Sequence, residues 1–99
     1  SMWFILHSLA FGFSVVGRHE EAIATAEKAI EEGAGAAIGH LALVRSLDAV
    51  GRTEEAKSAY QRALRAAPGF SPETAIPAVT DDTLRNSLLD AFRRAGWEG

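Results

Sequence analysis

The sequence repeats itself with a period of 34 residues, and this repeat restricts the possible fold more than any other feature. When residues 43–69 are compared with residues 9–35, nine positions are identical without a gap. In the second copy the identical residues are Leu43, Val50, Gly51, Arg52, Glu54, Glu55, Ala56, Ala63 and Gly69. A period of this length indicates an array of stacked units, each of which is one supersecondary structure.

Each copy predicts two helices joined by a tight turn. The first pair covers residues 3–16 and about 20–32, and the second pair runs from about residue 36 to 50 and from Thr53 to Pro68. Gly17 and Gly51 lie where a left-handed residue closes the first helix of each pair. Thr53 is the expected N-cap of the fourth helix. The segment from Gly33 to Gly35 is predicted to separate the two pairs.

The residue types at these places resemble the tetratricopeptide repeat family, whose unit is a 34-residue helix–turn–helix. That pattern places a large residue, Leu, a small residue and an aromatic on the first helix, then Ala-x-x-x-aromatic, a later Ala and Pro. The second unit has His40, Leu43, Val44, Leu47, Ala56, Tyr60, Ala63 and Pro68 at these places, and the first has Leu6, Leu9, Ala10, Phe13, Ala22, Ala26, Ala29 and Ala34. The departures from the pattern are His40, Val44 and Ala34. The resemblance covers roughly residues 3–70 and implies an all-α fold of stacked helix–turn–helix repeats, an α-solenoid.

Residues 71–97 depart from the repeat and are expected to form its C-terminal cap. Ser71-Pro72 starts a short helix that should end near Ala78, because Pro77 cannot donate a backbone hydrogen bond. A last helix is expected from Asp82 to Ala95, capped by Thr80 or Asp81 and closed by Gly96, with Trp97 folded back on Phe92. End units of repeat arrays are usually atypical, since one of their faces meets water.

The domain organisation follows from these segments. We expect one domain over residues 1–99, with repeat 1 at 3–36, repeat 2 at 37–70, and a partial third unit with the capping helix at 71–97. Ser1-Met2 is interpreted as a cloning remnant, so the chain is expected to be a fragment of a longer protein. Residues 68–96 also resemble the C-terminal end of bacterial adenylate and guanylate cyclases with repeat tails, which implies that any cyclase domain lies elsewhere in the parent protein.

Composition argues against several classes of function. The net charge is −3 and Lys and Arg are not clustered, which argues against nucleic-acid binding. The apolar opening from Trp3 to Val16 is shorter than the ~20 residues that a membrane span needs. We therefore expect no membrane insertion and a cytoplasmic location.

Candidate catalytic and metal-binding residues lack supporting partners. The chain has no Cys, and neither His7 nor His40 has a ligand three or four positions away, so no metal site is predicted. Glu20-Glu21 and Glu54-Glu55 are adjacent pairs whose side chains do not face each other on a helix. We expect no cofactor and no enzymatic activity.

The predicted binding site is a groove lined by the first helix of each unit. In the register of the resemblance its residues are Phe4, His7, Phe11, Ser14, Ile38, Leu41, Arg45 and Asp48. The Lys and Asn clamp that some family members use for a peptide carboxylate is absent, apart from Arg45 as a single donor. A mainly apolar groove suits an apolar helix or extended segment of a protein or peptide partner.

Three functions remain open at this point. The first is a non-catalytic interaction or scaffold module, as the regulatory tail of a larger bacterial signalling protein such as a nucleotide cyclase. The second is a self-association module, because the first helix is apolar around nearly its whole circumference. It predicts a homodimer with Phe4 and Phe11 at the interface. The third, a small-molecule or metal sensor, needs a pocket that two and a half repeats hardly enclose.

Overall fold

The computed structural model describes residues 2–33, 36–78 and 80–99. The expectations for Ala34 and Gly35 lie outside these residues. Within them the chain is all-α, with helices α1 (Met2–Val15), α2 (His19–Glu32), α3 (Ala37–Ala49), α4 (Thr53–Ala66), α5 (Pro72–Ala75) and α6 (Asp82–Arg94). The prediction of an all-α helical repeat fold is confirmed.

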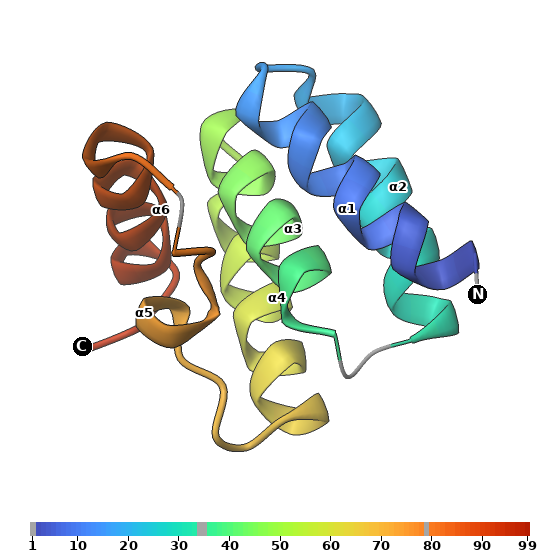
Figure 1. Cartoon of the computed structure of the whole chain (residues 1–99). Coiled ribbons are helices and arrows are strands. Elements are labelled where there is room, and N and C mark those ends of the chain that lie inside the picture. The colour runs from blue at the N-terminus through green and yellow to red at the C-terminus, as the bar shows by residue number, and fades with distance from the viewer. Residues whose placement is uncertain (1, 34–35, 79) are drawn as a thin grey trace.

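The helices form two layers around α3. In Figure 1, α1, α3 and α6 run side by side, with α2 behind α1 and α4 behind α3. Helix α3 packs against all five of the other helices. It is therefore the element on which both hairpins and the C-terminal segment depend.

The two hairpin turns have the same geometry, as the repeat predicts. Gly17 and Gly51 have φ angles of 87° and 82°, in the left-handed region that favours glycine. The residue after each glycine donates its backbone N–H five residues back, from Arg18 to Phe13 and from Arg52 to Leu47, each at 2.9 Å. These bonds satisfy carbonyl groups that the end of a helix leaves unpaired.

Helix α6 closes in the same way. The N–H of Trp97 donates to the carbonyl of Phe92 at 2.9 Å, and the Trp97 side chain packs against the core. At its start, the Asp81 carboxylate accepts from the N–H of Leu84 at 2.8 Å, which selects Asp81 from the two predicted caps.

Two local predictions are wrong. Thr53 is the first helical residue and not the N-cap of α4; Arg52 holds the cap position and makes no side-chain cap bond. The short helix α5 ends at Ala75 and not at Ala78. Ile76 is extended, with φ −64° and ψ 128°, because the ring of Pro77 disfavours helical backbone at the preceding residue.

The core combines small residues at helix crossings with an aromatic cluster under the cap. Ala22, Ala26, Ala29, Ala56 and Ala63 are all buried, which lets α2 and α4 approach their neighbours closely. Under the cap, Phe92 is fully buried. Its ring centroid lies 5.7 Å from that of Tyr60 and 5.7 Å from that of Phe70. The apolar face of α6 is thus joined to α4 and to the loop that follows it.

Candidate functional site

The most prominent surface feature is an apolar face on α1. Six large hydrophobic side chains are exposed in the described part of the chain, and five of them lie on α1 or on the residue after it. We define the α1 face as Phe4, Ile5, Ser8, Leu9, Gly12, Val15 and Val16, all of which are exposed. Phe4 is 64% exposed and Val16 is 69% exposed. Met2–Val15 contains no charged residue, so nothing on this helix offsets its apolar character.

The residues of the predicted groove divide into an accessible set and a buried set. Phe4 is exposed, and Phe11, Ile38, Arg45 and Asp48 are half-buried. Helices α1 and α3, which supply all of these residues, pack side by side (Figure 1). The accessible set therefore continues from the α1 face onto α3.

His7, Ser14 and Leu41 are buried within the chain. His7 is only 1% exposed, and its Nε2 lies 2.9 Å from the carbonyl oxygen of Gly33 at the end of α2. Its ring fits against α3 because residue 39 is glycine: a Cβ there would lie 2.2 Å from the Nδ1 of His7. These residues support the first-helix layer and offer no surface to a partner in this conformation.

Arg45 and Ser14 belong to a polar network that joins α1, α2 and α3. An Arg45 guanidinium nitrogen donates to the carbonyl and to the hydroxyl of Ser14, the latter at 3.2 Å. The Ser46 hydroxyl lies 2.8 Å from that of Ser14 and 2.9 Å from Nδ1 of His19. Burial first, and then the Arg45 charge, lower the pKa of His19, with Glu20 opposing them.

The carboxylate of Asp48 forms an ion pair with Arg94 of the C-terminal segment. The Arg94 guanidinium makes a two-pronged bond to its carboxylate, at 2.9 and 2.8 Å. The Asp48 side chain is 13% exposed in this pair. Helix α6 therefore covers the Asp48 end of the predicted groove on α3.

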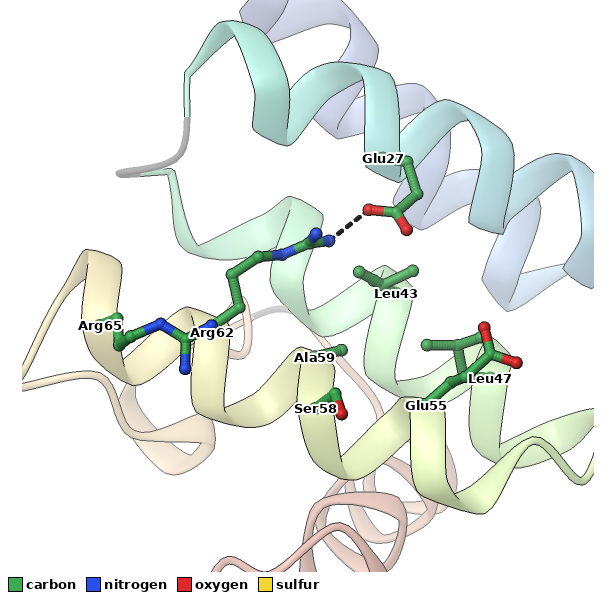
Figure 2. A pocket seen from close by; sticks show the side chains of 8 residues that line it. All are labelled: Glu27, Leu43, Leu47, Glu55, Ser58, Ala59, Arg62 and Arg65. Atoms are coloured by element: carbon green, nitrogen blue, oxygen red, sulfur yellow. Dashed lines mark hydrogen bonds and ion pairs between the residues drawn. The ribbon is translucent and has the colours of Figure 1, made fainter.

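A pocket of about 210 Å³ lies on the other side of α3, between α2 and α4. Figure 2 shows Leu43 and Leu47 of α3 in it, with Arg62 reaching across to the carboxylate of Glu27. Its full lining is Glu27, Leu43, Leu47, Glu55, Ser58, Ala59, Arg62 and Arg65. Glu55 is paired with Arg52, which also approaches Glu20 of α2 at 3.6 Å. The Arg62–Glu27 and Arg52–Glu20 pairs connect the second hairpin to α2.

Sequence reasoning missed these cross-hairpin pairs, although the repeat contains a signal for them. Glu27 and Arg62 are 35 positions apart, and Ser14 and Ser46 are 32 apart, both close to the 34-residue period. Residues one period apart lie on neighbouring equivalent helices, so opposite charges at that separation predict contacts. Asp48 and Arg94 are 46 positions apart and involve the non-repeating segment, so no such signal exists for them.

Across residues 2–33, 36–78 and 80–99, no group of three or more His, Cys, Asp or Glu side chains is placed to hold a metal ion. Within the same ranges, each helix is too short or too polar to cross a membrane.

Comparison with known proteins gives a match over one of the two hairpins. Residues 39–70 match the family model of the tetratricopeptide repeat. No curated protein and no solved structure matches the chain. The match covers most of α3, all of α4 and the turn that follows, which form the second unit of the internal repeat. The α3–α4 hairpin is thus similar to a tetratricopeptide repeat, within an all-α helical repeat fold.

Proposed function

We propose that this chain is a non-catalytic protein–protein interaction module that presents an apolar helical surface to a partner. The single observation that carries the proposal is the α1 face, whose five large apolar side chains are each at least 40% exposed. Apolar patches of this kind are rarely left uncovered on soluble proteins and mark sites of interaction. The tetratricopeptide match supports the same function, because this family is generally non-catalytic and typically binds proteins.

The proposed partner surface is the α1 face together with the accessible groove residues beside it. Phe4, Phe11 and Ile38 supply its apolar contacts, and Arg45 supplies a charged group beside them. His7, Ser14 and Leu41 hold these residues in place from beneath. The partner is an apolar helix or extended segment of a protein, since a mainly apolar surface carries few groups that select polar ligands.

Selection of peptides on the immobilised chain tests this proposal. We expect enriched peptides to be apolar and to lose at least tenfold in affinity for Phe4→Glu. The matched control is Gln61→Glu, an exposed position on α4, which should bind them as the unchanged chain does. If the enriched peptides bind both variants equally, the partner surface lies elsewhere.

Self-association is the second candidate function, and the apolar character of α1 favours it specifically. A second copy would cover the α1 face with a surface of the same composition. Sedimentation at micromolar concentrations should show a dimer for the unchanged chain and a monomer for Leu9→Glu. Leu9 is preferable to Phe11 as the test position because Phe11 also packs against the core. A monomer throughout the concentration range rejects self-association.

The wider setting is proposed from the sequence. The resemblance of residues 68–96 to cyclase tails supports a cytoplasmic regulatory tail of a larger bacterial signalling protein, organised as repeats at 3–36 and 37–70 with a cap at 71–97. The parent sequence tests this directly. A cyclase or other signalling domain in the same polypeptide supports the proposal, and a parent protein made only of helical repeats contradicts it.

A further inference from the structure

The α1 face has a pattern that reads nearly the same in both directions along the helix. Counted outward from Ala10, Ser8 corresponds to Gly12, Ile5 to Val15 and Phe4 to Val16. In each of these pairs both members are small or both are large. Leu9 corresponds to Phe11, which is half-buried beside the face. When two copies of this helix lie antiparallel with their Ala10 residues at the same level, the two members of each pair come to the same level along the axis. Small residues then meet at the centre and large residues meet toward both ends.

The small residues occupy the middle of this face. With 3.6 residues per turn, Ser8 and Gly12 lie one above the other along its centre line. Phe4 and Val15 form one flank, and Ile5, Leu9 and Val16 form the other. The face is therefore a shallow channel between two apolar ridges, and a second helix can approach closely along it.

Gly12 has no evident purpose within its own chain. A Cβ built at this position meets no atom within 4 Å, so nothing in the chain requires the absence of a side chain. Glycine inside a helix is nevertheless less favourable than alanine. A close approach from outside the chain explains why the position holds glycine.

Electrostatics favour a second copy in antiparallel orientation. The helix has no charged residue that would repel an identical helix. Arg18, which follows the C-terminal end of α1, is paired with Glu21 and leaves no net positive charge at that end. The orientation is therefore favoured by the helix dipoles, because an antiparallel contact brings their opposite ends together.

We propose that two copies of this chain pair through α1, antiparallel about a two-fold axis at the level of Ala10, with Ser8 and Gly12 at the crossing. This inference rests on the self-association proposed above and specifies its geometry. In this arrangement each flank lies against the same flank of the other copy, so Phe4 of one copy lies against Val15 of the other, and Ile5 lies against Val16. The two Phe4 residues lie ~18 Å apart along the helix axes.

Disulfide cross-linking of the chain tests the geometry. The chain has no cysteine, so Phe4→Cys and Val15→Cys each introduce a single thiol. A mixture of the two variants should form the mixed disulfide at least tenfold faster than either variant forms a disulfide with itself. Self-disulfides that form as fast as the mixed one indicate a parallel contact and overturn the proposal.

The second measurement is sedimentation of Gly12→Leu. A leucine fits the open space in the monomer, so the helical circular dichroism should be retained, but it fills the crossing and should weaken dimerisation at least tenfold. The matched control is Ala24→Leu on the exposed side of α2, which should leave the dimer unchanged.

The outcomes separate this inference from the function on which it rests. A dimer lost in Leu9→Glu but unaffected by Gly12→Leu keeps self-association and rejects the crossing. A dimer that survives both substitutions places the interface away from α1, and an unchanged chain that is monomeric rejects both statements.

Discussion

Gly12 and Gly39 both lie inside helices, and they differ in what a methyl group would meet. A Cβ at Gly12 has open space, whereas a Cβ at Gly39 would overlap the buried ring of His7, 2.2 Å from Nδ1. The first glycine is thus unexplained by the chain itself. The second is required because His7 must fit between α1 and α3.

This difference predicts opposite effects for the same substitution. Gly39→Ala should destabilise the chain by about 1–3 kcal/mol, since the ring and helix α3 must shift to admit the methyl group. Gly12→Ala should stabilise the monomer by about 0.5–1 kcal/mol through helix propensity. Both changes in the free energy of unfolding are measured by urea unfolding in a Leu9→Glu background. This substitution is expected to prevent association, so association does not contribute to the measured stability. Equal effects of the two substitutions would contradict the packing of His7 described here.

His19 should make stability depend on pH. In the unfolded chain its pKa is near 6.5. In the folded chain burial and Arg45 lower the pKa, against the opposing charge of Glu20. Below pH 6.5 the unfolded chain therefore binds more protons, so the free energy of unfolding falls as the pH drops toward the folded pKa. At pH 8 both forms are neutral and His19 contributes no pH dependence.

The measurement is the urea midpoint of unfolding at pH 8, 6.5 and 5, for the unchanged chain and for His19→Gln. We expect the decrease below pH 6.5 to be smaller in His19→Gln than in the unchanged chain. Parallel pH profiles would show that the network around Ser46 does not restrict protonation of His19.

At the scale of helices, the sequence predicts most boundaries because the signals that end a helix are local. Gly17, Gly51 and Gly96 end helices by their own backbone preference, and all three have positive φ. The incorrect end of α5 also has a local cause in Pro77. Thr53 is predicted as the N-cap of α4 because Thr is a good cap in isolation, but the glycine turn places Arg52 at that position.

The site was harder to predict than the helices. The repeat register places His7, Ser14 and Leu41 on the first-helix layer, but it does not tell which neighbour covers them. Ser14 is buried by Arg45 and Ser46, and Asp48 is bound by Arg94 of the non-repeating segment. Burial depends on contacts between distant elements, which a periodic pattern describes only inside the repeat.

Removing the C-terminal segment should expose the aromatic cluster. Phe92 covers Tyr60 and Phe70, so deletion of residues 80–99 leaves these rings in water. We expect the truncated chain to bind a hydrophobic dye and to aggregate. A chain that lacks only Glu98 and Gly99, which are exposed, is the control and should behave as the full chain. A truncated chain that stays monomeric and melts cooperatively would make α6 an appendage.

At the scale of the whole molecule, the central position of α3 makes the stability of each unit depend on the others more than is usual in repeat proteins. In long arrays each unit contacts only its neighbours, and stability is approximately a sum over units. Here α3 packs against both helices of the first hairpin, its own partner α4, and both helices of the cap. The Arg45 network and the Asp48–Arg94 pair connect it to both sides. Loss of any one element thus removes contacts from the helix that the others need.

This arrangement predicts that hairpins and cap unfold together. In the variant Trp3→Phe the single remaining tryptophan, Trp97, reports on the cap, while far-ultraviolet circular dichroism reports on all helices. The two urea transitions, recorded at one protein concentration, should coincide in midpoint and in slope, with a slope of about 1 kcal/mol/M. The cap buries Phe92 against Tyr60 and Phe70, so unfolding of the cap alone would expose these rings to water. Helices α1–α4 would stay folded, so their conformational entropy would not be gained to offset that cost. A tryptophan transition at lower urea than the dichroism transition would show that α5 and α6 open alone and that α3 does not bind the molecule into one cooperative unit.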